Sequence, residues 1–314
     1  MLRIRTALMI ALFVAIADAA TKSNPSTYSY RLVFVIACLA AWYVFSTSVN
    51  DLADEEIDQI NLKGYHERPL ANKQTTRSKL WNLGAASALA TILFALPLGA
   101  TATYAAFGGL ILSYIYSMPP LQISHHGFVA TTLLPLGYIA LPCVLVLQAN
   151  NAILDDSKII LFAALYISFM GRIILKDFRD VIGDRKFGKR TFIVRHGAKA
   201  TCAVSGALFV VGSGIMMYRF RAMPLLAALL LPYTAIILFA LRQLSLETRV
   251  KRQVSFVGLV GRLANGAALL AISGLYYELE RTPNTILYSA LFVGVALFGL
   301  SAAYALYAPL LAKK

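Results

Sequence analysis

The sequence is poor in charge and in cysteine, and both shortages exclude classes of protein. Only 14% of the 314 residues are charged whereas 59% are hydrophobic, which is not the composition of a soluble globular domain. The three cysteines lie in apolar segments without CxxC spacing, so neither a zinc site nor a disulfide framework is predicted. The net charge of +14 comes without a basic domain interleaved with aromatic residues, so nucleic acid is not an expected partner.

Long apolar runs fill most of the chain. About 20 apolar residues cross a bilayer core as a helix, and barrel strands would alternate in a way that these runs do not. The runs lie at about residues 5–20, 30–50, 79–98, 100–118, 127–148, 158–177, 198–217, 222–242, 255–276 and 284–308. We therefore predict an all-α, multi-spanning bundle of nine to ten transmembrane helices, forming one membrane domain over residues 1–314 and surrounded by membrane lipids.

The first run allows two interpretations. Arg3 and Arg5 precede ALMIALFVAIADAA, which resembles either a short first span or a signal peptide with a small-residue cleavage site. The other loops indicate orientation, because 22 of the 29 basic residues fall on one side when the runs are taken as successive spans. The positive-inside rule predicts that this side is cytoplasmic and that both termini face it.

Two acidic segments follow apolar runs on that predicted cytoplasmic side. The first reads NDLADEEID from residue 50, and the second reads KDFRDVIGD from residue 176. At 100° per residue, each segment places its polar residues within roughly a 100° arc of one helix face. These residues are Asn50, Asp51, Asp54 and Asp58 in the first segment and Asp177, Asp180 and Asp184 in the second.

Such clusters of like charge at helix C-termini are unfavourable unless a cation is bound. Carboxylates without histidine or cysteine suit hard cations, and Mg²⁺ uses one or two carboxylates while phosphate oxygens and water complete its coordination. The two segments together predict a diphosphate held through Mg²⁺. The alternatives are solvated helix ends at the membrane surface, or a cation transporter, although a transporter would place its carboxylates near the bilayer midplane.

Basic residues follow each acidic segment and suit the same ligand. Lys63, Arg68 and Lys73 follow the first segment, and the second is followed by Arg185, Lys189, Arg190 and Arg195. Arginine can bind phosphate oxygens bidentately and lysine acts as a point charge. Anionic lipid could equally explain basic cytoplasmic loops. We select Arg68, Lys73 and Lys189 as diphosphate ligands.

The two acidic motifs, NDLADEEIDQIN followed by RPL and KDFRDVIGDRKFGKRT, resemble the signature segments of the UbiA superfamily of intramembrane prenyltransferases. A third segment, from Tyr114 to Leu121, is similar to the YS-x-PPL loop of members that prenylate homogentisate or chlorophyllide. This chain departs from the related loop at Gln122 and Ser124, where basic residues commonly stand.

The resemblance implies a helix bundle around a central cavity and a prenyltransferase that uses a polyprenyl diphosphate and Mg²⁺. The implied catalytic metal ligands are Asp51, Asp54, Asp58, Asp177, Asp180 and Asp184. The expected substrate contacts are Asn50, Arg68, Lys73, Tyr114, Tyr116, Lys176 and Lys189. An allylic cation needs a water-poor pocket, where Trp42, Phe45 and the two tyrosines are candidates for cation–π contact.

The acceptor is open at this stage. An electron-rich aromatic ring of the 4-hydroxybenzoate or homogentisate type is the first expectation, in quinone or related lipid biosynthesis. The alternative is the hydroxyl of a lipid such as geranylgeranylglyceryl phosphate, because the second acidic motif suits either acceptor. No residue is a convincing general base, since His125 and His126 stand in a loop where histidines are usually solvated.

Overall fold

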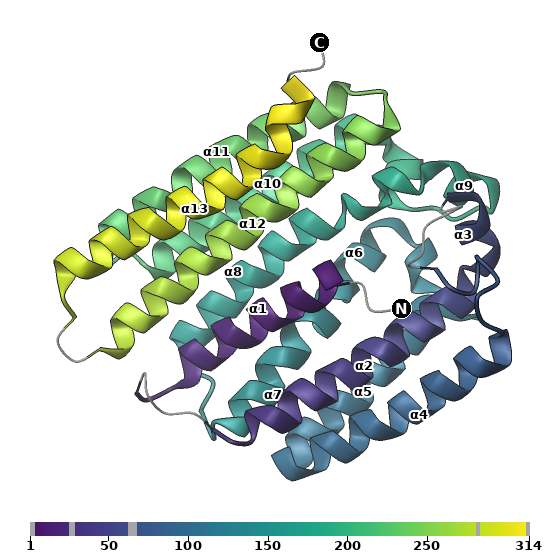
Figure 1. Cartoon of the computed structure of the whole chain (residues 1–314), viewed down its shortest axis with the longest axis horizontal. Coiled ribbons are helices and arrows are strands. Elements are labelled where there is room, and N and C mark those ends of the chain that lie inside the picture. Colours follow the sequence, from purple (N-terminus) through teal and green to yellow (C-terminus); the bar gives the residue numbers. More distant parts are fainter. Residues whose placement is uncertain (1–3, 25–28, 62–67, 281–282, 312–314) are drawn as a thin grey trace. The chain divides into compact units, whose positions relative to one another are not determined.

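The structure is a computed structural model that describes residues 4–24, 29–61, 68–280 and 283–311 (Figure 1). Within those ranges the regular elements are all helices, which confirms the predicted all-α class. The thirteen α-helices are α1 (Ile4–Thr21), α2 (Leu32–Ala53), α3 (Glu55–Asn61), α4 (Arg77–Ala95), α5 (Ala100–Ser117), α6 (Gly127–Pro135), α7 (Leu141–Ala149), α8 (Asp156–Ile173), α9 (Val181–Lys186), α10 (Phe192–Arg219), α11 (Pro224–Leu246), α12 (Val250–Leu279) and α13 (Thr285–Leu311).

Every predicted apolar run forms a helix, but the helices differ in length and hydropathy, which decide whether a helix can span a membrane. Eight segments of the described chain are long and apolar enough to cross a bilayer. The two remaining runs form α1 and α5, which have 18 residues each. The run at 127–148 is one span built from α6, a π-helical turn (Leu136–Ala140) and α7. Pro135 and Pro142 flank the π turn, and proline cannot donate the hydrogen bond that a regular helix needs.

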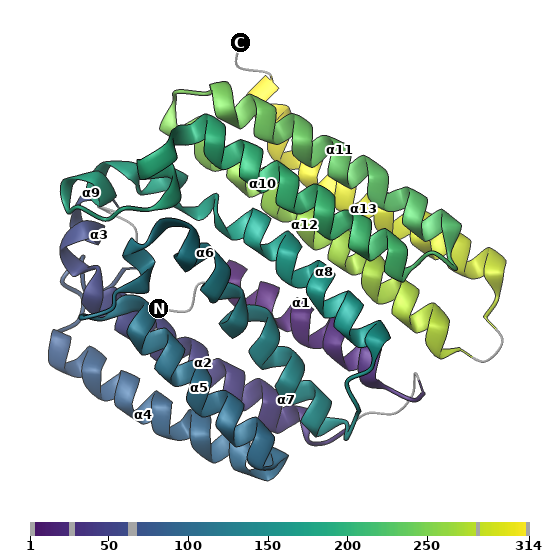
Figure 2. The ribbon, with the colours of Figure 1, turned by 180° about the vertical axis from the view of Figure 1, so that it is seen from behind.

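The contacts of the chain divide it into two compact units. The first unit consists mainly of residues 28–153 and 180–195, and in it α2 packs along both α4 and α5. These helices also run beside one another in the rear view of Figure 2. Trp42 of α2 donates a hydrogen bond from Nε1 to the carbonyl of Gly109 at 3.1 Å. A Cβ at Gly137 would stand 2.7 Å from the Trp42 ring, so glycine there lets the π turn approach α2.

The second unit consists mainly of residues 154–179 and 196–314. In it α12 packs against α11 and α13. The hydroxyl of Tyr233 donates to the carbonyl of Ala296 at 2.8 Å, which ties α11 to α13. A Cβ at Gly299 would stand 2.2 Å from that hydroxyl oxygen, so only glycine fits at this point of α13.

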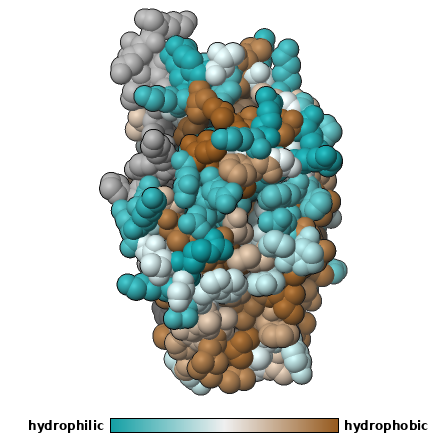
Figure 3. Space-filling view, turned by 90° about the vertical axis from the view of Figure 1, so that its right-hand side faces the viewer, coloured by the Kyte–Doolittle hydropathy of each residue, from teal (hydrophilic) through white to brown (hydrophobic). Residues whose placement is uncertain are grey.

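The surface agrees with the span assignment. Large apolar side chains such as Leu89, Tyr104 and Leu297 are exposed on their helices, as lipid contact requires. Figure 3 shows the side on which the labels of α3 and α9 lie in Figure 1, and hydrophilic side chains gather there. These two short helices carry Asp58 and Asp184 of the acidic motifs, so this part of the motifs lies at polar helix ends.

Candidate active site

The first acidic motif lies at the junction of α2 and α3. The regular helix breaks at Asp54, which has φ −98° and ψ 14°. The hydrogen bonds of the turn nevertheless continue, because the Asp54 N–H donates to Asn50 and the Asp58 N–H donates to Asp54. The side chains of Asp51, Asp54 and Asp58 are all buried. We call Asn50, Asp51, Asp54, Asp58 and Arg68 the α2–α3 cluster.

Arg68 lies at the centre of this cluster. Its guanidinium pairs with Asp51, lies 3.0 Å from the Oδ2 of Asp58, and donates to the Oδ1 of Asn50 at 3.2 Å. Burial opposes the charge on Arg68, but the carboxylates of Asp51, Asp58 and Asp54 outweigh it and raise the pKa of the arginine. The prediction from the sequence made Arg68 a phosphate ligand, whereas here it holds the carboxylates together.

The pKa of Asp58 reflects the negative charge that surrounds it. Burial raises the pKa of its carboxyl to about 7, and the neighbouring Asp54, Asp51 and Asp180 act in the same direction while Arg68 opposes them. The influence of Asp180 shows that the first unit brings part of the second acidic motif close to the first. The cluster therefore holds more negative charge than Arg68 alone neutralises.

Asn61 makes the direct link between the two motifs. Its Oδ1 accepts the Gly183 N–H at 2.7 Å, and its Nδ2 donates to the carbonyl of Asp180 at 2.9 Å. This pair of hydrogen bonds joins the end of α3 to the start of α9, where Asp184 is only 1% exposed. The sequence alone does not predict this role, although Asn61 ends the first motif and is the kind of residue that bonds to a neighbouring backbone.

The loop after α9 adds a second buried cation. Lys189 Nζ lies 3.3 Å from the Oδ2 of Asp54, and Lys189 is buried. The predicted basic residue is thus beside the first acidic motif, although 135 positions separate the two. His125 is also close, since burial and the charge of Lys189 lower its pKa while Asp54 opposes the shift.

Two buried hydroxyls lie in the segments before α6 and after α9. The backbones of His126 and Arg190 pair as an isolated parallel bridge, which places the segment before α6 beside the segment after α9. Ser124 and Thr191 are 3% and 2% exposed, and neither hydroxyl has a hydrogen-bond partner among the described residues. Buried polar groups are normally bonded, so these two are available to a ligand. The sequence marks Ser124 only as a departure from a related loop and gives no signal for Thr191.

The remaining predicted residues differ in their exposure and in their partners. Asp177 and Lys176 belong to the second unit, where Lys176 Nζ lies 2.5 Å from the Oδ1 of Asp177. Lys73 is exposed, Tyr114 is 43% exposed and Tyr116 is buried. Lys63 lies outside the described residues.

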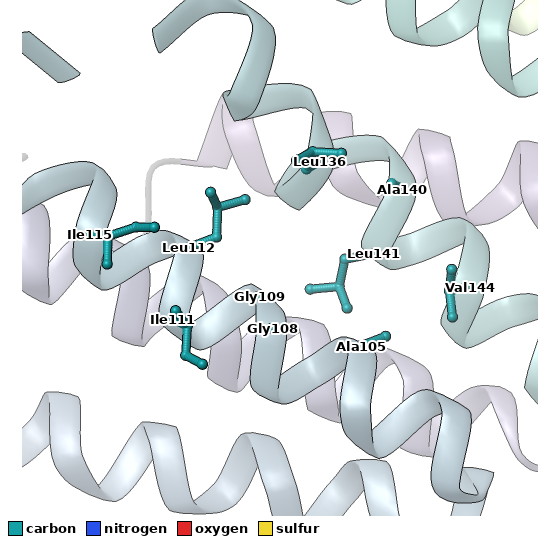
Figure 4. Close-up of a pocket in the computed structure, with 10 residues that line it drawn as sticks. All are labelled: Ala105, Gly108, Gly109, Ile111, Leu112, Ile115, Leu136, Ala140, Leu141 and Val144. Atoms are coloured by element: carbon teal, nitrogen blue, oxygen red, sulfur yellow. The ribbon is translucent and has the colours of Figure 1, made fainter. Parts of the chain in front are cut away.

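An apolar cavity of about 400 Å³ opens elsewhere in the first unit, between α5, the π turn and α7 (Figure 4). Apolar side chains and glycines line it, among them Gly108, Gly109, Leu112, Leu136 and Val144. None of the predicted site residues contributes to its wall. The cavity is therefore separate from the α2–α3 cluster.

The donor set can be compared with what a metal requires. Within the described residues no three acidic, histidine or cysteine side chains stand together as a ready-made metal site. The carboxylates of the cluster instead contact Arg68 and Lys189. Oxygen donors in excess over these two cations fit Mg²⁺, provided that the two basic side chains move when the metal enters.

Comparisons with known proteins indicate the family of the chain. The model of the UbiA prenyltransferase family matches residues 7–266. Chloroplastic chlorophyll synthase of Arabidopsis thaliana is 32% identical over 204 residues, which cover 60% of this chain and 51% of that protein. Digeranylgeranylglyceryl phosphate synthase of Pyrococcus horikoshii is 26% identical over 208 residues, which cover 62% of this chain and 67% of that protein.

The fold is shared with a solved structure. A UbiA homologue from Archaeoglobus fulgidus, bound to DMAPP and Mg²⁺, superposes with a TM-score of 0.58 at 14% identity, covering 97% of this chain and 98% of that one. The chain spans about half the length of the chlorophyll synthase that it matches. Because the family model covers most of the sequence, the chain belongs to the UbiA prenyltransferase family.

Proposed function

We propose that this integral, multi-pass membrane protein transfers a prenyl group from a polyprenyl diphosphate to an acceptor in a Mg²⁺-dependent reaction. The main support is the buried α2–α3 cluster, in which three carboxylates face the two cations Arg68 and Lys189. The excess of carboxylate oxygen suits a further cation. The Mg²⁺ and DMAPP bound to the Archaeoglobus homologue support the same ligands here.

In this proposal the aspartates position the metal and do not attack the substrate. Asp51, Asp54 and Asp58 hold it from the first motif, and Asp177, Asp180 and Asp184 hold it from the second. Bound Mg²⁺ supplies neutralisation of the negative charge that develops on the departing diphosphate. The C–O bond to the prenyl group breaks, and the electron pair leaves with the diphosphate.

The basic residues have two successive partners in this scheme. In the structure Arg68 and Lys189 pair with the carboxylates. When a metal takes those carboxylates, the donors of Arg68 and Lys189 become available to phosphate oxygens. Lys73 and Lys176 are further proposed contacts, and Asn50 orients Asp54 through a 2.8 Å hydrogen bond.

The buried hydroxyls complete the proposed diphosphate site. Ser124 stands in the loop where related sequences carry basic residues, and Thr191 follows Lys189 by two positions. Each can donate one hydrogen bond to a phosphate oxygen without giving up an existing one. Neutral donors thereby take the place of the missing basic side chains.

The acceptor then forms a bond to the allylic carbon and loses a proton. We propose an electron-rich aromatic ring as the acceptor, on the basis of the YS-x-PPL loop that contains Tyr114 and Tyr116. The name of the Pyrococcus relative supports a second candidate, the hydroxyl of a glyceryl phosphate lipid. The excess of basic residues on one side of the spans supports a cytoplasmic position for the site and both termini.

The test uses the purified full-length chain in detergent. It is incubated with labelled geranylgeranyl diphosphate, Mg²⁺ and, separately, 4-hydroxybenzoate, homogentisate or geranylgeranylglyceryl phosphate. We expect a prenylated product from one acceptor, loss of that product in EDTA, and loss in Asp54→Asn and Asp184→Asn proteins.

The matched control is Asp155→Asn, which removes an aspartate outside both motifs that pairs with Lys158. It should retain the transfer rate of the wild type. The metal-site assignment would be wrong if folded Asp54→Asn protein bound and transferred the diphosphate as well as wild type. Turnover that persists in EDTA would contradict the Mg²⁺ requirement.

A further inference from the structure

Arg172 is a charged residue inside an apolar span of the second unit. It lies near the end of α8, within the candidate membrane span Asp156–Arg179. Charged groups in such spans are costly unless they are paired, and they are usually functional. Arginine stays protonated in proteins, so this positive charge persists.

The charge of Arg172 has no carboxylate partner among the described residues. Its single hydrogen bond runs from Nη1 to the Oδ1 of Asn265 on α12 at 2.6 Å. An amide oxygen accepts this bond but supplies no negative charge, and a guanidinium carries five N–H donors. Four donors and the net charge therefore remain for another group.

A glycine of α12 lies close beside the guanidinium. A Cβ at Gly261, one turn before Asn265, would stand 3.3 Å from Nη2, 3.4 Å from Nε and 3.5 Å from Cζ of Arg172. Nη2 and Nε form the edge that binds two oxygens of a carboxylate or phosphate at once. Glycine at this position thus leaves room for the guanidinium beside α12.

The position of Arg172 relates it to the reaction. Asp177 follows it by five residues in the same unit, beyond the end of α8 at Ile173. An anion at Arg172 would therefore lie within the apolar α8 segment and close in sequence to the second acidic motif.

We infer that Arg172, with Asn265 and Gly261, binds an oxyanion of the acceptor, so that the acceptor is an acid. This inference rests on the proposed prenyl transfer and narrows its substrate class. The oxyanion is either the carboxylate of an aromatic acid or the phosphate of a lipid, since both present two oxygens to the same edge. Arg172 is a substrate-binding residue and takes no part in breaking the diphosphate bond.

The test compares acids with matched neutral probes by equilibrium binding to the purified protein. One arm uses 4-hydroxybenzoate and 4-hydroxybenzyl alcohol, and the other uses geranylgeranylglyceryl phosphate and geranylgeranylglycerol. We expect the wild type to bind the acid of one arm about tenfold or more tightly than its neutral partner. The arm that shows this preference identifies the source of the oxyanion.

Two variants should abolish the preference for the acid. Arg172→Gln removes the charge, and Gly261→Ala keeps the charge but places a methyl group 3.3–3.5 Å from three atoms of the guanidinium, so that Arg172 has to shift. Two controls should keep it. Arg262→Gln removes an arginine of α12 that bonds to the carbonyl of Ala302, and Gly214→Ala adds a methyl group where no atom lies within 4 Å.

Binding of geranylgeranyl diphosphate with Mg²⁺, measured on the same proteins, separates this inference from the proposed function. Arg172→Gln should leave that binding unchanged. Equal binding of acid and neutral probes by the wild type, absence of acid binding, or retained preference in folded Arg172→Gln and Gly261→Ala proteins would overturn the inference. Preference for the acid without any prenyl transfer would support the oxyanion site and contradict the proposed function.

Discussion

The side chain of Asn61 uses both of its polar atoms to bind the backbone at the start of α9, accepting from the Gly183 N–H at 2.7 Å and donating to the Asp180 carbonyl at 2.9 Å. An asparagine amide has the donor and the acceptor that such a two-point contact needs. Because the contact joins α3 to α9, it fixes the distance between carboxylates of the two acidic motifs. The geometry of the proposed diphosphate site therefore depends on a residue that is itself uncharged.

Replacing Asn61 should lower both the stability of the fold and the affinity of the site for the diphosphate. Asn61→Ala removes both hydrogen bonds and leaves a backbone N–H of α9 without its partner, which costs about 1–3 kcal/mol. Gly183→Ala attacks the same contact from the other side, because its Cβ would stand 2.6 Å from Asn61 Oδ1. We expect both variants to lower the unfolding temperature and the affinity for geranylgeranyl diphosphate with Mg²⁺.

The two measurements need a control for the addition of a methyl group. Gly214→Ala on α10 provides it, because a Cβ there meets no atom within 4 Å. Full diphosphate affinity in both Asn61→Ala and Gly183→Ala proteins would show that the contact does not position the carboxylates.

The sequence predicted the helices well because each span requires its own long apolar run, which is a local property. It also located both acidic motifs, since carboxylates at the end of an apolar run are conspicuous. It did not predict the break of the helix at Asp54, because the four-residue spacing of Asn50, Asp54 and Asp58 is preserved across the break.

Long-range partners were beyond the sequence for a physical reason. Lys189 pairs with Asp54, which is 135 positions away in the sequence, and Arg172 donates a hydrogen bond to Asn265, which is 93 positions away. No local sequence pattern predicts such pairings. The basic loops contain many lysines and arginines, so composition alone does not show which of them are buried. Burial of Arg68 and Lys189, and exposure of Lys73, come only from the packed structure.

Removing the charge of Arg68 should make the stability of the protein depend on Mg²⁺. Arg68→Gln leaves Asp51 and Asp58 buried without their cation, which destabilises by about 3–5 kcal/mol when metal is absent. A bound divalent ion can replace the lost charge. We expect the unfolding temperature of this variant to rise more on addition of millimolar Mg²⁺ than that of the wild type.

A surface pair serves as the control for this measurement. Arg77→Gln removes an arginine that pairs with Glu55 at an exposed position, which should change stability by only about 0–1 kcal/mol with no added response to Mg²⁺. If Mg²⁺ shifted the unfolding temperature equally in wild type and Arg68→Gln, the cluster would not be the metal site.

Removing the buried hydroxyls should weaken diphosphate binding without changing the stability of the fold. Ser124→Ala and Thr191→Val remove no existing hydrogen bond, so the free energy of unfolding should stay within about 0.5 kcal/mol of wild type. Each loses one neutral donor to the diphosphate, which should weaken geranylgeranyl diphosphate binding about 2- to 12-fold. Ser113→Ala is the control, since its hydroxyl bonds within α5 to Gly109. Unchanged diphosphate affinity in the double variant would exclude both hydroxyls from the site.

The proposed orientation can be tested with single added cysteines, because Cys38, Cys143 and Cys202 are all buried and should label poorly. Gln74→Cys lies in the exposed basic loop after the first acidic motif, and Ile153→Cys lies in the exposed loop between α7 and α8. With the basic side cytoplasmic, a membrane-impermeant thiol reagent added to intact cells should label Ile153→Cys and spare Gln74→Cys. Opening the cells should expose Gln74→Cys, and wild-type protein gives the background. The opposite labelling pattern would place the acidic motifs outside the cytoplasm and contradict the orientation, without changing the chemistry proposed for them.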